Sequence, residues 1–466
     1  MAADTIAPVQ AVHLKRALGV WDLTWLCVVA VLNLNVVPVI AANGPITLWL
    51  WLASLALFFL PQGIAVIDLS HRFPNEGGLY VWTKEMYGDL HGFLCGWSYW
   101  TSNLFFIPTL LFYLVGIVTY MGGKTAAGFG ENRLFFFLLT VGLLWLTAWA
   151  NIRGLGVGKW VNNAGGIGAL IGAAILIALG ALTLAHAGVR ISARSLGPGA
   201  LDWRVVSSFG IICFGLVGLE LGPVMGDEIR EPRRSIPRGI LLGGLLAGTF
   251  YLGATLAVLL AIPQNEIQVV QGVLQGIDKM AAQIGLGWVL YPLALLISVS
   301  IVGSTSAWLS GSARIIFVSG LDRYMPKILG KVHRRYGTPH IALVAIAAMS
   351  SLLVAMSFAG GTTVREAYVT LLDLAVVVQM ISYLYLFAAL ARVAFEPGHG
   401  PGFYSKARIR FAAAAGLLTT TIGLVVAFIP SHQVSSIWRF ELKMFLTTAV
   451  FMGLAAGLFF YYRKKI

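Results

Sequence analysis

One stretch of the sequence combines apolar residues with groups that can handle a polar solute. Residues 209–238 read FGIICFGLVGLELGPVMGDEIREPRRSIPR. The first part is apolar enough to lie in a bilayer, yet it contains Glu220. A carboxylate near the middle of a membrane span costs on the order of 2.5–3.5 kcal/mol or more. Glu220 is therefore a candidate for binding a cationic group or carrying a proton, although a structural acid bonded to a neighbouring helix is the alternative.

The same stretch contains residues that interrupt a helix, which are Gly215, Gly218, Gly222, Gly226 and Pro223. Glycine destabilises a helix by roughly 1 kcal/mol and proline by about 3 kcal/mol. Unwound backbone at membrane depth is tolerated where it lines a cavity. We therefore predict a broken transmembrane helix at Gly215–Gly218, whose exposed carbonyls and amides line a substrate site.

A second interruption occurs near the start of the chain, in WDLTWLCVVAVLNLNVVPVIAANGP at residues 21–45. Asn33 and Asn35 lie in the middle of this apolar run, and Pro38 follows them. The two asparagines either line a cavity or form hydrogen bonds between helices. Paired interruptions in corresponding halves of a sequence indicate a transporter site at the interface of an inverted repeat.

The composition defines the elements that must position these residues. Of 466 residues, 58% are hydrophobic and only 11% are charged. A soluble core of this size would need far more polar surface, so the sequence predicts an all-α membrane protein. Twelve apolar runs are long enough to cross roughly 30 Å of hydrocarbon. Their predicted limits are 21–44, 46–69, 88–120, 133–152, 160–186, 207–226, 238–262, 285–317, 339–358, 366–391, 409–430 and 441–462.

The spacing of the two interruptions predicts two halves of five helices, at 21–186 and 207–391, whose first helices are discontinuous. Together they form a transport core over 21–391, and two further helices follow at 409–462. Lys and Arg gather in alternate loops, as at Arg230, Arg233 and Arg234. By the positive-inside rule, the tails at 1–20 and 463–466 are predicted to be cytoplasmic in a multi-pass protein of the cell (inner) membrane. Such basic loops meet anionic lipid rather than nucleic acid.

Signals for other chemistry are weak. The three cysteines all lie in apolar runs, without the spacing of a disulfide framework or a zinc site. The histidines lie in loops, tails or helix ends, so we predict no metal site, no cofactor and no enzyme activity. Next to the predicted break, we expect Asp227, Glu228 and Glu231 to form ion pairs with the neighbouring arginines. The loop at 263–284 is predicted to contain short helices, which either cover a vestibule or simply lie on the surface.

Three stretches resemble the amino acid–polyamine–organocation superfamily of secondary transporters. The first, FPNEGGLYVWTKEMYGDLHGFLCGWSYW (Phe73–Trp100), resembles its Pro-x-x-Gly-Gly-x-Tyr loop and the Gly-Trp that opens its third helix. Gly218–Ile240 is similar to its helix 6 and the loop that follows, and Ala313–Leu343 to its helix 8–9 loop. The resemblance implies a five-plus-five inverted repeat with two further helices, and secondary transport.

The resemblance also implies site residues. Glu220 stands at the family's acidic position in helix 6, and Phe214 matches an aromatic residue that closes over bound substrate. Asn33, Leu34 and Asn35 stand where many members have Gly-x-Gly, whose bare amides hold a carboxylate. A mid-helix lysine of some proton-coupled members is missing after Lys159, so proton coupling through it is excluded. The expected substrate-binding residues are Asn33, Leu34, Asn35, Val36, Asn103, Phe214, Gly215 and Gly218, with Glu220 as the coupling residue.

The sequence thus predicts a permease that moves an amino acid or a related amine by alternating access. Glu220 would suit a basic amino acid or polyamine, but a neutral amino acid fits equally well. Proton coupling, sodium coupling through Ser304 to Ser306, and exchange without ion coupling all stay open. A channel or an integral membrane enzyme is the remote alternative. The expected partners are a small-molecule substrate and membrane lipid, with the chain a monomer or homodimer.

Overall fold

The computed structural model describes residues 18–74, 77–123, 127–187, 208–322, 324–358, 362–396, 401–429 and 437–465. Most of the predicted N-terminal tail and of the loop before residue 208 lies outside these ranges. Within them the regular structure is helical, apart from an isolated bridge between Leu18 and Ile229. Long apolar runs explain this, because a helix satisfies all backbone groups internally where no water is available.

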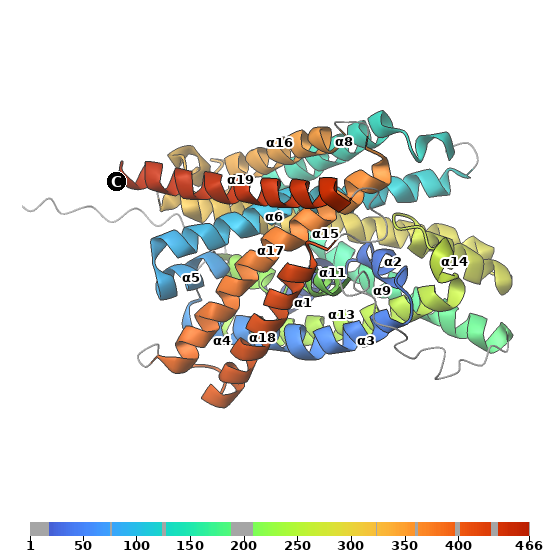
Figure 1. Cartoon of the computed structure of the whole chain (residues 1–466), viewed down its shortest axis with the longest axis horizontal. Helices are drawn as coiled ribbons and strands as arrows, with labels where there is room; N and C mark the ends of the chain where they lie inside the picture. Colours follow the sequence, from blue (N-terminus) through green and yellow to red (C-terminus); the bar gives the residue numbers. More distant parts are fainter. Residues whose placement is uncertain are drawn as a thin grey trace, which may run out of the picture.

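Ten helical segments in the described ranges are long and apolar enough to cross a membrane, and they lie side by side in one bundle (Figure 1). They coincide with ten of the twelve predicted spans. The first is formed by α3 (Ile46–Ser54), the π-helical turn η1 (Leu55–Phe59) and α4 (Leu60–Arg72). The others are α6 (Asp89–Met121), α8 (Arg133–Ile152), α9 (Leu155–Ala187), α13 (Pro232–Ala261), α15 (Leu290–Leu321), α16 (His340–Ser357), α17 (Val364–Phe395), α18 (Lys406–Val426) and α19 (Ile437–Arg463).

The other two predicted spans are pairs of short helices. The first pair is α1 (Val20–Val31) and α2 (Val36–Ala41), and the second is α11 (Ser208–Gly215) and α12 (Leu221–Val224). We call residues 32–35 the first break and residues 216–220 the second break. In the second break Gly218 has φ +133°, a conformation that side chains with a Cβ rarely adopt. Unwinding continues two residues beyond the predicted limit, so Glu220 lies at its end.

Glycines bring helices close together around the first pair. A Cβ atom at Gly243 of α13 would lie 2.6 Å from the Cβ of Cys27 in α1, and one at Gly239 would lie 2.8 Å from that of Leu23. Larger residues therefore do not fit without displacing a helix. Close backbone approach through small residues is a typical means of helix association in membranes. These two contacts, about one turn apart, join α1 to α13.

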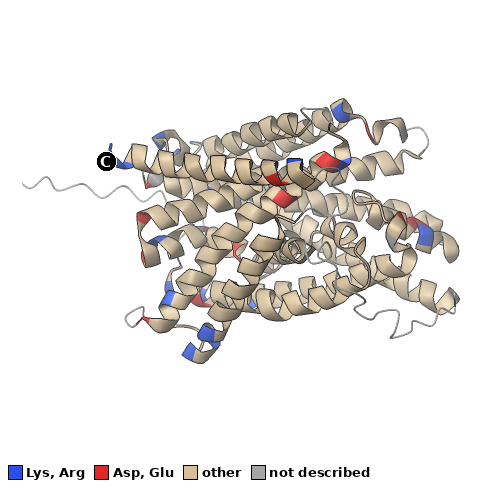
Figure 2. Cartoon of the chain, viewed as in Figure 1, with Lys and Arg blue, Asp and Glu red and all other residues tan. Residues whose placement is uncertain are grey.

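Lys and Arg are grouped at the left-hand end of the bundle in Figure 2, around α5 (Leu79–Tyr87), the end of α4 and the start of α18. We call this the basic end. Two backbone hydrogen bonds close it. The amide of Leu18 donates to the carbonyl of Glu228 (3.0 Å), and the amide of Arg230 donates to the carbonyl of Leu18 (2.8 Å). Leu18, just before α1, is thereby fixed to the segment between α12 and α13.

A buried ion pair reinforces this closure. Arg314 of α15 donates from Nη2 to both oxygens of Glu228, at 2.7 and 2.9 Å. The two side chains are only 4% and 1% exposed. The prediction that Glu228 pairs with its neighbouring arginines was therefore wrong, because its carboxylate points into the bundle. Glu231 does lie near its neighbour Arg234, at 3.8 Å on the surface, while the side chain of Asp227 is outside the described part.

A second set of contacts at the basic end involves α5 and the loop after α15. Asp322 accepts hydrogen bonds from Lys84 Nζ (2.8 Å) and from the Tyr80 hydroxyl (2.5 Å). Partial burial lowers the pKa of Lys84, but the hydrogen bond and charge of Asp322 outweigh it, so the pKa lies above its usual value. Lys84 thus stays charged throughout the physiological pH range, and its contact with Asp322 does not depend on pH there.

Replacing Glu228 by Gln should destabilise the fold, because Arg314 would stay buried without its carboxylate. Removing one partner of a buried pair typically costs 3–5 kcal/mol. We expect a clearly lower thermal unfolding temperature in detergent for Glu228→Gln. Glu231→Gln is the matched control, since an exposed pair contributes about 1 kcal/mol or less. Equal unfolding temperatures for the two variants would contradict a stabilising role for the Glu228–Arg314 pair.

Candidate functional site

The two breaks lie against each other inside the bundle, near α2 and α11 in Figure 1. A Cβ atom at Gly215 would lie 3.2 Å from the side chain of Val36, and one at Gly218 would lie 3.1 Å from the backbone of Ala30. Gly215, the last residue of α11, and Gly218, in the second break, therefore face the residues that flank the first break at close range. Two segments of irregular backbone meet at one depth, although they are almost 200 residues apart in the sequence.

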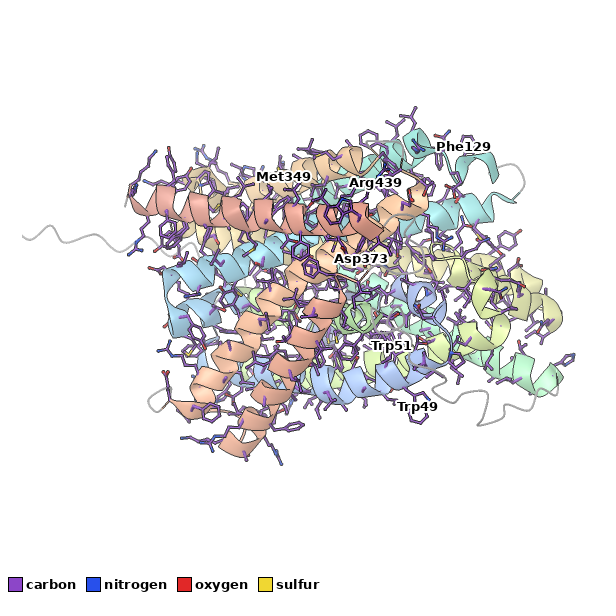
Figure 3. The ribbon with its side chains drawn as sticks, viewed as in Figure 1. Trp49, Trp51, Phe129, Met349, Asp373 and Arg439 are labelled. Atoms are coloured by element: carbon purple, nitrogen blue, oxygen red, sulfur yellow. The ribbon has the colours of Figure 1, made fainter. Side chains whose placement is uncertain are left out.

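A single tyrosine connects these segments. The Tyr251 hydroxyl of α13 accepts a hydrogen bond from the Asn33 amide (2.8 Å) and lies 3.0 Å from the Gly215 carbonyl. It also hydrogen bonds to the carbonyl of Val31. Its ring stacks on Trp51 with the centroids 4.5 Å apart, and Figure 3 shows Trp51 directed into the bundle. Tyr251 thus satisfies backbone groups of both breaks, which lipid could not do.

The two asparagines of the first break have different surroundings. The Asn33 side chain donates to the Ala30 carbonyl (2.5 Å) and accepts from the Ser304 hydroxyl of α15 (2.6 Å). Asn35 donates to the Tyr368 hydroxyl (3.4 Å), and its Oδ1 has no partner among the described residues, although it is buried. Asn33 therefore acts as a bond between helices, whereas Asn35 keeps an acceptor available.

The backbone of the first break also has free donors. Within the described residues, the amides of Leu34 and Asn35 donate to no acceptor, while the Val36 amide donates to the Asn33 carbonyl (3.3 Å). The side chains of Leu34 and Val36 are buried. Two adjacent unpaired amides at membrane depth are costly unless a ligand satisfies them. They could hold an anionic group such as a carboxylate.

Glu220 is fully buried at the end of the second break. Its Oε2 accepts hydrogen bonds from the Tyr383 hydroxyl (2.5 Å), the Gly218 amide (3.0 Å) and Gln62 Nε2 (3.2 Å). Its Oε1 has no hydrogen-bond partner in the described chain. No Lys, Arg or His of the described ranges forms an ion pair with it either, so three donors stabilise a carboxylate that has no internal cation.

Helix α6 adds two further polar groups beside Glu220. The Tyr99 hydroxyl interacts electrostatically with Glu220 and has no hydrogen-bond partner among the described residues. Asn103 follows one turn later and donates to the Tyr99 carbonyl (2.8 Å), which leaves its buried Oδ1 unpaired in the described structure. The unpaired acceptors of Asn35, Asn103 and Glu220 therefore come from three separate segments, which are the first break, α6 and the second break. Such acceptors suit an ammonium group.

Phe214 belongs to an aromatic group between α6, α11 and α15. Its ring meets the edge of Phe106 (centroids 4.9 Å apart), and Phe106 meets Trp308 (5.6 Å). Trp308 Nε1 donates to the Ala30 carbonyl (3.2 Å). The group thus contacts α1 two residues before the first break. Phe214 itself lies two residues before the second break, and its role over a bound substrate stays a prediction.

A cavity of about 740 Å³ lies at the end of the bundle opposite the basic end. Its lining includes Tyr120 of α6, Arg365 of α17, and Gln271 and Asp278 beside or on α14 (Gly272–Gln283). The Tyr120 hydroxyl donates to Asp278 (3.0 Å). The helix predicted in the loop at 263–284 is therefore present as α14, and its Asp278 lines this cavity. A role of the cavity as a vestibule stays a prediction.

Sequence reasoning missed Gln62, Tyr251, Tyr368 and Tyr383, which hold the site together. Gln62 could have been found, since it is a polar residue in an apolar span. The tyrosines carry no such signal, because tyrosine is common in membrane helices. Ser304 was named as a possible sodium ligand, and its hydroxyl is used by Asn33. No group of three His, Cys, Asp or Glu residues in the described ranges could hold a metal ion.

The amino acid permease family model matches residues 18–454, which include both breaks, Glu220 and all ten long helical segments except the last turns of α19. The chain belongs to the amino acid permease family. It is therefore a membrane transporter, and the relatives described next are also transporters rather than enzymes.

Two relatives and one solved structure illustrate what this permease is similar to. An uncharacterized transporter of Legionella pneumophila is 26% identical over 440 residues, which cover 92% of this chain and 93% of that protein. The probable agmatine/putrescine antiporter AguD of Lactococcus lactis is 24% identical over 375 residues, covering 80% and 78%. The solved structure of MhsT in complex with L-phenylalanine has a TM-score of 0.60 at 14% identity, covering 89% and 99%, so the permease shares its fold.

Removing the Tyr251 hydroxyl should weaken the junction of the two breaks. Tyr251→Phe leaves the Asn33 amide and the Gly215 carbonyl without this partner, and an unsatisfied buried group costs about 1–3 kcal/mol. We expect a lower unfolding temperature in detergent and weaker substrate binding. Tyr291→Phe is the control, because Tyr291 is 64% exposed on α15. If both variants unfold like the wild type, Tyr251 does not stabilise the breaks.

Proposed function

We propose that this permease moves an amino acid by alternating access to a site formed by the two breaks. In this proposal each broken pair counts as one span, which gives twelve spans with both termini in the cytoplasm. The two halves, at 21–186 and 207–391, form an inverted repeat, with α18 and α19 appended. Broken helices at matching places in two halves support this arrangement.

The observation that carries the proposal is the pairing of free donors with free acceptors at one depth. The unpaired amides of Leu34 and Asn35 suit the carboxylate of an amino acid. The unpaired oxygens of Asn35, Asn103 and Glu220 suit its ammonium group. A zwitterion would satisfy both sets at once, which lowers the cost of leaving them buried. The aromatic group with Phe214 would then cover the substrate.

Glu220 is proposed as the coupling residue. A buried carboxylate without an internal cation is expensive in a membrane, so it favours the binding of a positive charge. A proton or the ammonium group of the substrate can supply that charge. In either case the positive charge beside the Glu220 carboxylate changes when the substrate leaves, and this change links Glu220 to the transport cycle.

A second candidate function is the exchange of amines that lack a carboxylate. The same unpartnered oxygen of Glu220 favours it, and so do the asparagine side chains in place of the family's small glycines. The similarity to a probable agmatine/putrescine antiporter is in line with it. In this case the amides of Leu34 and Asn35 would be satisfied by a carbonyl or by water rather than by a carboxylate.

Matched ligands separate the two candidates. We expect an amino acid to stabilise the purified permease against heat more than the amine that results from its decarboxylation. Arginine with agmatine and ornithine with putrescine form such pairs. Hydrogen bonds to a charged group contribute about 1.5–3 kcal/mol, so binding should differ roughly 10- to 150-fold. Equal or tighter binding of the decarboxylated ligands would favour amine exchange.

The role of Glu220 can be measured in proteoliposomes. Glu220→Gln keeps the shape and removes the negative charge, so we expect at least a tenfold loss of uptake driven by a pH gradient. Glu131→Gln is a suitable control, because Glu131 is an acid of the outer cavity. A Glu220→Gln protein that keeps full pH-dependent uptake would exclude Glu220 as the coupling residue. Uptake that never saturates would instead indicate a channel.

A further inference from the structure

An apolar groove of about 540 Å³ runs along the membrane-facing surface between the α3–α4 segment and α13. Small residues make room for it, with Ala56 and Gly63 on one wall and Gly244 and Gly248 on the other. Exposed leucines form the rim, where Leu60 is 58% and Leu245 is 72% exposed. At membrane depth, such a surface can only be covered by lipid or by another apolar helix.

The floor of the groove reaches the functional site. Leu219 lies there, and a Cβ atom at Gly63 or Gly244 would come within 3.7 or 3.6 Å of its side chain. Leu219 precedes Glu220 in the second break. The π-helical turn at Leu55–Phe59 forms part of the same wall, and such turns are frequent at functional sites. Whatever fills the groove therefore packs directly against the second break.

The length of the groove fits one leaflet. On α13 its lining extends from Ile240 to Leu252. Twelve residues of helix rise roughly 18 Å, and half of the hydrocarbon core is about 15 Å thick. A single acyl chain could therefore lie along the groove from the interface to the middle of the membrane. A second copy of the chain would instead need a surface that continues into the other leaflet.

The groove has basic residues where it opens toward the basic end of the bundle. Tyr404 lines it there, and Arg408 is close enough to interact with the Tyr404 hydroxyl. Arg238 is exposed on α13, three residues before Leu241 and thus on the same helix face. Figure 2 shows Lys and Arg at the start of α18, beside the end of α4. Basic residues next to an apolar cleft favour the headgroup of an anionic lipid.

We propose that an anionic phospholipid of the leaflet at the basic end occupies this groove. One acyl chain lies between Ala56 and Gly244 and rests on Leu219, while the phosphate lies near Arg238. The lipid thereby supports the second break from outside. Under the topology argued above, this is the cytoplasmic leaflet.

Native mass spectrometry of the purified full-length permease tests the acyl-chain position. The protein is exposed to equal amounts of phosphatidylglycerol and phosphatidylcholine in detergent, and the retained lipids are counted. We expect Ala56→Trp to retain one phosphatidylglycerol fewer than the wild type, because the indole fills the groove from an exposed position. Ala414→Trp is the matched control, since Ala414 is exposed on α18 outside the groove. Equal retention by both variants would overturn the proposal.

The headgroup position is tested separately with Arg238→Gln, and Arg334→Gln serves as the control because it removes the same charge from a loop outside the groove. A basic residue near an anionic surface contributes about 1 kcal/mol, so we expect roughly fivefold weaker retention of phosphatidylglycerol for Arg238→Gln alone. Equal retention of the two lipids by the wild type would refute the anionic headgroup. Loss of a dimer mass in Ala56→Trp, without loss of lipid, would show that a second copy fills the groove.

Discussion

The structure depends on how the backbone of two interrupted helices is satisfied in a medium without water. Tyr251 does this for both breaks with one hydroxyl, which contacts backbone groups of residues 31–33 and of Gly215. Because the same atom serves both segments, they are held at one depth and in a fixed register. The groups that Tyr251 does not reach, at Leu34, Asn35 and Glu220, are the ones that we propose for binding a solute.

The site lies between two ends of different character. At the basic end, backbone pairing of Leu18, the buried pair of Glu228 with Arg314 and the contacts of Asp322 close the bundle. At the other end, α14 covers a cavity of about 740 Å³. A buried ion pair is a suitable element for such a closure, since its desolvation energy nearly offsets its attraction. Its two arrangements, formed and separated in water, can then differ by little free energy.

The sequence was informative where a residue type conflicted with its surroundings. Asparagines and a proline in one apolar run, and glycines in another, predicted the two breaks, and the carboxylate of Glu220 in an apolar run predicted a functional acid. The partners of these residues could not be predicted, because Tyr251 and Tyr383 are ordinary in a membrane helix and their value lies in where their hydroxyls point. The predicted partner of Glu228 was wrong for a related reason. Its nearest cations in the sequence are on an exposed helix start, whereas Arg314, 86 residues away, is inside the bundle.

The close contact of α1 with α13 has a mechanical consequence. Gly239 and Gly243 leave no space between these helices, so a tilt of α1 must carry α13 with it. α13 is also one wall of the membrane-facing groove, while the opposite wall belongs to α3 and α4. Any rearrangement that moves α1 therefore changes the width of this groove, which faces the hydrocarbon of the membrane. Lateral pressure and chain packing in the surrounding bilayer would then act on the turnover rate through the same pair of helices.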